Sequence, residues 1–120
     1  MSKEFLKNLE TKYGGCVSIA QAALLLQLSE RQLMQAMVAG AVIAADCDNR
    51  YMFPVFQFKG GQILPGLTSL LSHTKGATPE EIMEFLWNPL GELTPIDMLL
   101  AGPTEVEMFE MTNAAMGWFL

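Results

Sequence analysis

Apolar residues recur at helical spacing twice in the first third of the chain. Ser18 is a favourable N-cap, and the alanines and leucines that follow it recur three and four positions apart as far as Leu26. Ser29 is a second N-cap, and Gly40 suits the position just beyond a helix end. The residues expected to point inward are Ile19, Ala22, Ala23, Leu26, Leu33, Met34, Met37 and Val38. Two short helices separated by about three residues predict a helix-turn-helix.

A β-hairpin is predicted directly after the second helix. Residues 42–45 and 50–53 favour strands, and the Asp-Cys-Asp-Asn segment at 46–49 favours the turn between them. Pro54 should end the pairing, because proline cannot donate to a strand ladder. A helix-turn-helix followed by a hairpin is a winged arrangement. The alternative is a helical hairpin that serves only for packing.

The back half repeats one helix-start signal. Residues 78–81 read Thr-Pro-Glu-Glu and residues 94–97 read Thr-Pro-Ile-Asp, so each segment offers a cap, a first-turn proline and an acid. The Asn-Pro pair at 88–89 and Gly102 should end these two helices, and Thr104 should cap a last one. The pattern therefore predicts three consecutive helices.

Together these signals predict a mainly α fold, in which a small helix-turn-helix with a β-hairpin wing precedes a C-terminal helical bundle. We expect the helix-turn-helix and wing in residues 1–58, a connector in 59–76 and the helical, partner-binding domain in 77–120. A chain of 120 residues that is 51% hydrophobic can bury a core of this size.

The sequence contains no signal for a membrane span, a metal site or a catalytic group. No apolar run approaches the roughly 18 residues that span a bilayer, and the first residues lack the apolar centre of a signal peptide. Cys16 and Cys47 form no metal motif and are interpreted as reduced core thiols. His73 has no nearby partner for catalysis. We therefore expect a cytoplasmic protein that is not an enzyme and has no catalytic residue, metal or cofactor.

Charge is divided sharply along the chain. All seven basic residues lie in the first 75 positions, where five acids leave a net charge of +2. The remaining 45 positions hold eight acids and no base, a net charge of −8. Such asymmetry predicts two surfaces for different partners: the front for a polyanion, and the back for a basic cleft on a protein.

The second helix offers side chains that can read DNA. Glutamine pairs with adenine and arginine with guanine in the major groove, and an arginine in the wing can reach a phosphate. The predicted DNA-binding residues are Ser29, Arg31, Gln32, Gln35 and Arg50. Because phosphate neutralisation supplies much of the affinity, a net charge of +2 favours a homodimer that doubles these contacts.

A resemblance to a known family lies in the back half. Residues 85–89 read Phe-Leu-Trp-Asn-Pro, and residues 90–99 read Leu-Gly-Glu-Leu-Thr-Pro-Ile-Asp-Met-Leu. This run resembles the toxin-binding domain of the Xre–MbcA–ParS antitoxins, which neutralise RES-domain toxins that consume NAD. The likeness extends from about 78 to 117, and the segments 53–58 and 64–67 are similar to the linker of relatives that carry a small DNA-binding domain in front. The loop at 88–91 is shorter than the family's usual loop.

The resemblance implies where the protein partner would bind. In these antitoxins the C-terminal region reaches toward the toxin's active site, and here the chain ends in three large apolar residues. The predicted partner-binding residues are Trp87, Asn88, Trp118, Phe119 and Leu120. The alternative is that the tail packs onto the chain's own helices or those of a twin subunit.

Two functions remain open. The first is an antitoxin-like regulator that neutralises a RES-type toxin and binds operator DNA. The second is a phage- or plasmid-type inhibitor that covers a functional surface of a host protein, with the helix-turn-helix as a scaffold.

Overall fold

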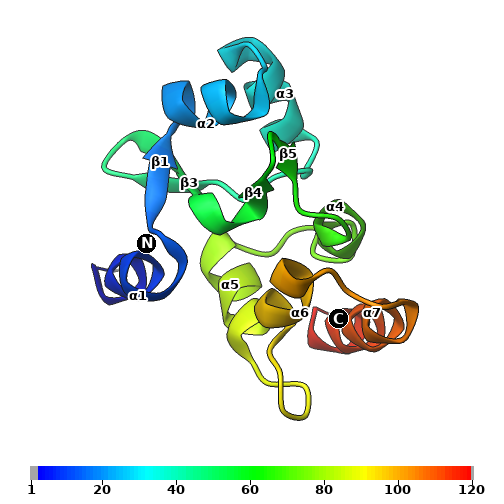
Figure 1. Cartoon of the computed structure of the whole chain (residues 1–120). Helices are drawn as coiled ribbons and strands as arrows, with labels where there is room; N and C mark the ends of the chain where they lie inside the picture. The colour runs from blue at the N-terminus through cyan, green and yellow to red at the C-terminus, as the bar shows by residue number, and fades with distance from the viewer. Residues whose placement is uncertain (1–2, 120) are drawn as a thin grey trace. The chain divides into compact units, whose positions relative to one another are not determined.

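The computed structural model describes residues 3–119 and divides the chain into two compact units, Met1–Ile63 and Leu64–Leu120 (Figure 1). In unit 1, helix α1 (Lys3–Tyr13) precedes the elements β1 (Cys16–Ser18), α2 (Ile19–Leu26), α3 (Glu30–Val38), β2 (Ala45–Cys47), β3 (Arg50–Pro54), η1 (Val55–Gln57), β4 (Phe58–Lys59) and β5 (Gln62–Ile63). Unit 2 consists of helices α4 (Leu67–Leu71), α5 (Pro79–Trp87), α6 (Pro95–Ala101) and α7 (Glu105–Trp118).

The predicted helix-turn-helix is present as α2 and α3. Each helix begins in a capping box, in which the serine Oγ accepts from the backbone N–H of a glutamine three positions later and that glutamine's side chain accepts from the serine N–H. Between them Gln27 adopts a left-handed conformation with φ 56°, which turns the chain sharply. Gly40 follows α3 with φ 75°, as expected of a residue beyond the C-cap.

The wing is a three-stranded antiparallel sheet in the order β1-β3-β2. Strand β1 was not predicted; it pairs Val17 with Phe53 across the sheet. The predicted hairpin is present as β2 and β3, but the bounds of its first strand and turn were wrong. Strand β2 begins at Ala45, and the turn contains only Asp48 and Asn49, both with positive φ. A two-residue turn of that conformation matches the twist of the paired strands. Pro54 is the last residue of β3, as expected.

Gln57 explains why the segment before β2 is not a strand. This side chain is completely buried, and its Oε1 accepts from the Ile43 N–H at 2.7 Å. Its Nε2 donates to the carbonyl oxygens of Ile43 at 2.8 Å and Pro54 at 3.0 Å. The backbone of Ile43 is thereby paired with a side chain instead of a neighbouring strand.

The core of unit 1 lies between the helix-turn-helix and the sheet. One cluster of buried side chains there consists of Ala22, Ala23, Leu26, Leu33, Val42 and Phe53. Seven of the eight predicted inward side chains are buried or half-buried, but Val38 is 83% exposed. Val38 is the last residue of α3 and lies on the side of the helix that faces away from the core, so the prediction for it was wrong.

The last three helices of unit 2 begin where the sequence signals predicted. Thr78, Thr94 and Thr104 are the N-caps of α5, α6 and α7, and each hydroxyl accepts a backbone N–H three positions later. Helix α5 ends at Trp87 and Gly102 caps the end of α6. The core contains Leu64, Leu67, Leu70, Leu71, Met83, Phe85, Leu86, Ile96, Met98, Leu99, Met111 and Ala115.

The expected connector at 59–76 is divided between the two units. Strands β4 and β5 pair within unit 1, whereas α4 packs against α7 in unit 2. With five strands besides its helices in residues 3–119, the fold is mixed α/β rather than mainly helical. None of the helices described is long and apolar enough to cross a membrane.

Candidate nucleic-acid interface and partner surfaces

The outer face of α3 presents one stripe of side chains. Arg31, Gln35 and Val38 are all exposed and follow one another at intervals of four and three residues, so they lie on the same side of the helix. A guanidinium, an amide and a methyl-bearing side chain are the groups that read guanine, adenine and the thymine methyl in a major groove. The stripe therefore has the chemistry of a recognition helix, and Val38 is a member that the sequence pattern had assigned to the core.

Ser29 and Gln32 hold the start of α3 in place. The Ser29 Oγ accepts from the Gln32 N–H at 3.1 Å, and the Gln32 Oε1 accepts from the Ser29 N–H at 2.9 Å. These bonds use acceptor positions of both side chains and do not use the serine O–H or the glutamine NH₂ as donors. Both residues are exposed. In contact with DNA, these groups could act as hydrogen-bond donors.

Arg50 opens strand β3 beside the wing turn. It is exposed and pairs across the sheet with Cys47. Asp46 and Asp48, which are exposed on the same hairpin, add negative charge close to it. The wing therefore offers one cation in an acidic setting, which weakens its attraction for phosphate.

The two units differ in the chemistry of their helix starts. The capping boxes of unit 1 close with the neutral Gln21 and Gln32, whereas those of unit 2 close with Glu81 and Glu107. Hydrogen bonding from the Thr78 N–H lowers the pKa of the Glu81 carboxyl, so this group stays ionised at the helix start. The capping boxes of unit 1 therefore add no carboxylate to the positive helix ends, and the only acid in the first turn of α3 is Glu30.

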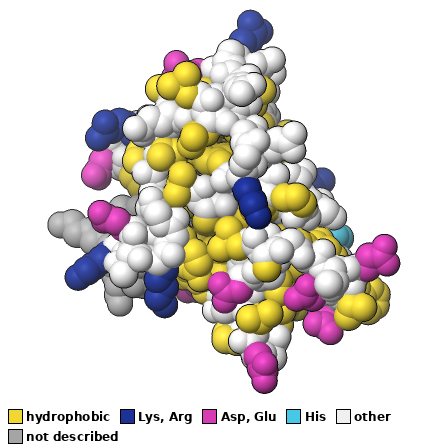
Figure 2. Space-filling model, viewed as in Figure 1, with side chains coloured by type: hydrophobic (Ala, Val, Ile, Leu, Met, Phe, Trp, Pro, Cys, Tyr) yellow, Lys and Arg dark blue, Asp and Glu magenta, His cyan; other side chains and the backbone are white. Residues whose placement is uncertain are grey.

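Net charge follows the same division. Unit 1 contains six basic and five acidic residues, a net charge of +1, and unit 2 contains one basic and eight acidic residues, a net charge of −7. Figure 2 shows the acidic side chains gathered over the helices of unit 2. A polyanion would accordingly meet unit 1 with less repulsion than unit 2.

Two of the predicted partner-binding residues at the C-terminal end, Trp118 and Phe119, pack within unit 2. Trp118 and Phe119 both pack edge-on against the buried Phe85 ring, at centroid distances of 5.8 and 5.6 Å. Trp87 is half-buried, and Asn88 is exposed as the C-cap of α5. Leu120 lies outside the described residues. The aromatic tail thus covers part of unit 2's own core.

The residues that carry the family resemblance have local structural roles. Leu90 and Leu93 close a tight turn, in which the Leu90 N–H donates to the Leu93 carbonyl at 2.8 Å and Gly91 has φ 80°. Thr94 caps α6, and Pro95 is its buried first residue. These residues of the run thus form a tight turn and the start of α6.

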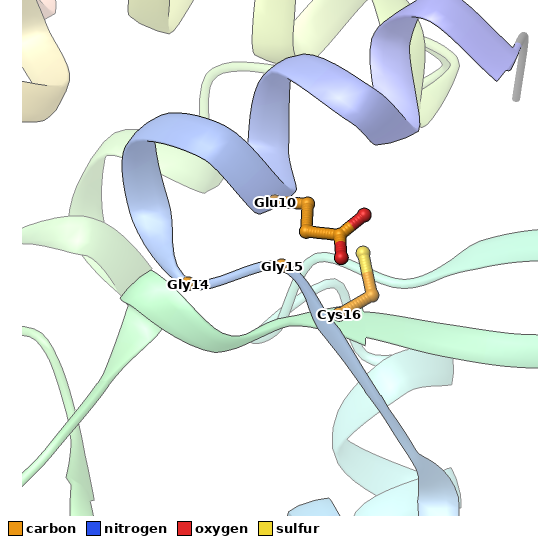
Figure 3. Close-up of a pocket in the computed structure, with 4 residues that line it drawn as sticks. All are labelled: Glu10, Gly14, Gly15 and Cys16. Carbon is orange, nitrogen blue, oxygen red and sulfur yellow. The ribbon is translucent and has the colours of Figure 1, made fainter.

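A shallow pocket in unit 1 offers little chemistry. It is lined by Glu10, Gly14, Gly15 and Cys16 (Figure 3). Burial, and to a smaller extent the Cys47 thiol, raises the pKa of the Cys16 thiol to about 11. A thiol that stays protonated at neutral pH is a poor nucleophile. No group of three or more His, Cys, Asp or Glu suited to a metal occurs in the described part of the chain.

Comparison with known proteins supports the architecture. The fold defines a small mixed α/β protein with a helix-turn-helix and a three-stranded wing. The NMR structure of Rv2175c is similar to it, with a TM-score of 0.68 over 88% of this chain and 81% of that one, at 21% identity. No family model matches the sequence, and no curated protein matches it. The two chains share a fold, and the likeness to the Xre–MbcA–ParS antitoxins stays a prediction from residues 78–117.

Proposed function

We propose that the chain is an antitoxin-like regulator. Unit 1 binds operator DNA through α3, and the acidic unit 2 binds and neutralises a protein partner, a RES-type toxin. The observation that carries the DNA-binding half is the exposed stripe of Arg31, Gln35 and Val38 on a helix whose capping box is neutral. The partner-binding half is supported by the net charge of −7 on unit 2 and by the run at residues 85–99.

The alternative function uses the helix-turn-helix as a scaffold. In that case the chain is an inhibitor that covers a functional surface of a host protein. The modest net charge of +1 on unit 1 favours this alternative, since specific DNA binding usually draws on several phosphate contacts.

Binding to the chain's own promoter separates the two functions. We expect binding that weakens as salt rises, and a loss of at least tenfold when Arg31 and Gln35 are both changed to Ala. Both side chains are exposed, so thermal stability should hardly change. Gln62→Ala, an exposed change outside α3, is the matched control. Absence of promoter binding at low salt would favour the inhibitor.

A further inference from the structure

Helix α7 has a second apolar face that its own unit does not cover. Val106, Phe109 and Met116 are 66%, 68% and 53% exposed. The opposite face buries Met111 and Ala115 in the core. In Figure 2 apolar side chains stand among acidic ones at the lower right, where Figure 1 places α7. The outer face is thus not needed to hold the helix on unit 2.

The spacing of this face is that of a coiled-coil seam. Starting from Val106, the apolar positions fall three and ten residues later, and Asn113 occupies the position seven residues later. These are successive a and d positions over two heptads, with one polar residue at an a position. An asparagine there selects one register and one number of helices in the contact.

The acidic residues beside this seam indicate which kind of helix can bind to it. Glu105 and Glu110 are exposed and lie on the two edges of the stripe, at g and e positions. In a parallel pair of two α7 helices these glutamates would face each other across the interface. Like charges in that arrangement repel, and unit 2 as a whole carries −7, so a second copy is a poor occupant.

We propose that the outer face of α7 docks a basic amphipathic helix of the protein partner. The helix would place apolar side chains on Val106, Phe109 and Met116 and lysine or arginine beside Glu105 and Glu110. This inference rests on the partner-binding half of the proposed function. It moves the main contact away from the aromatic tail, whose rings already cover Phe85.

The test uses the full chain and a designed three-heptad peptide. The peptide carries apolar residues at a and d, one asparagine at a matching a position, and lysine at every e and g position. A second peptide with glutamate at e and g is its control. Titration into the ¹⁵N-labelled chain gives both the affinity and the residues whose signals move.

We expect the lysine peptide to move signals of α7, to bind less tightly at high salt, and to bind at least tenfold more tightly than the glutamate peptide. Phe109→Lys should weaken binding at least tenfold. Leu24→Lys, which likewise replaces an exposed apolar side chain by lysine but at a 79% exposed residue of unit 1, should leave the affinity unaltered. Thermal unfolding should be close to that of the parent chain for both variants.

Three results would overturn the proposal. They are absence of lysine-peptide binding, equal binding of the two peptides, and a dimer of the chain itself that Phe109→Lys dissociates, which would make a second copy the occupant. Promoter binding by Phe109→Lys is measured in parallel. If it persists while the peptide result fails, α7 docking is refuted and the DNA-binding half of the proposed function still stands.

Discussion

The side chain of Gln57 makes the hydrogen bonds to Ile43 that a neighbouring strand would otherwise make. Its amide both accepts from and donates to Ile43, as an opposing peptide group would, and also bonds the Pro54 carbonyl. Because the residue is completely buried, each of these bonds replaces one that water would otherwise make. The chain between α3 and the wing is therefore held by one polar residue in an apolar setting.

We expect Gln57→Leu to lower the free energy of unfolding by about 3 kcal/mol, since the side-chain size is kept while the Ile43 N–H and C=O lose their partner. Urea unfolding measures the change. Gln62→Leu, at an exposed position of β5, should change it by less than about 0.5 kcal/mol. Equal effects of the two substitutions would show that the buried amide has no special role.

The Cys16 thiol should make stability depend on alkaline pH. Burial raises its pKa in the folded chain from the ordinary value of 9.0 to about 11. Between these values the unfolded chain has lost the thiol proton and the folded chain has kept it, so the free energy of unfolding falls as pH rises.

Cys16→Ser removes this titration. The free energy of unfolding of the parent chain minus that of the variant should therefore fall steadily from pH 9 to pH 11. Taking the difference cancels the contributions of groups that behave alike in the two proteins. Parallel curves for the two proteins would contradict the expected shift.

At the scale of elements, helix ends and the hairpin of β2 and β3 were predictable, whereas the third strand of the sheet was not. A cap is satisfied within three or four residues, so Ser29 with Gln32 or Thr94 with Asp97 can be recognised in the sequence alone. Strand β1 depends on β3, and the pairing of Ile43 depends on Gln57, fourteen residues away. Such pairings depend on how distant segments pack together, so the local sequence does not indicate them.

The candidate site shows the same limit. Arg31 and Gln35 were placed correctly on the exposed face of α3, because their positions follow from the helix period. Val38 is apolar and was therefore assigned to the core, but it lies on the exposed side of α3 with Arg31 and Gln35. The sequence did not predict the exposed apolar face of α7. The helix carries apolar residues on two faces, and only the packing shows which face is buried.

The tail of α7 provides a prediction about an element. Phe119→Ala should lower the free energy of unfolding by roughly 1–3 kcal/mol, because the Phe119 ring covers the buried Phe85 ring. Phe109→Ala, on the exposed face of the same helix, should cost less than about 0.5 kcal/mol. Denaturant midpoints compare the two. If Phe119→Ala leaves stability unchanged and abolishes partner binding, the tail is a contact surface instead.

At the scale of the whole molecule, two units of opposite net charge share one short chain. The weak positive charge of unit 1 leads us to expect a homodimer, in which two α3 helices would reach DNA about one helical turn apart. Light scattering should then give twice the chain mass. A single species of 13.2 kDa, at concentrations in the tens of micromolar, would contradict the dimer.

The central claim is that the start of α3 faces a polyanion, and Gln32→Glu tests it most directly. Glutamate keeps the capping box and suits the positive helix end, so thermal stability should stay the same or rise slightly. The added carboxylate would repel phosphate, so promoter affinity should fall at least tenfold at low salt and more than in Gln62→Glu, which adds the same charge to β5. Promoter binding that is equal for the parent chain and both variants would contradict a DNA-binding role for α3.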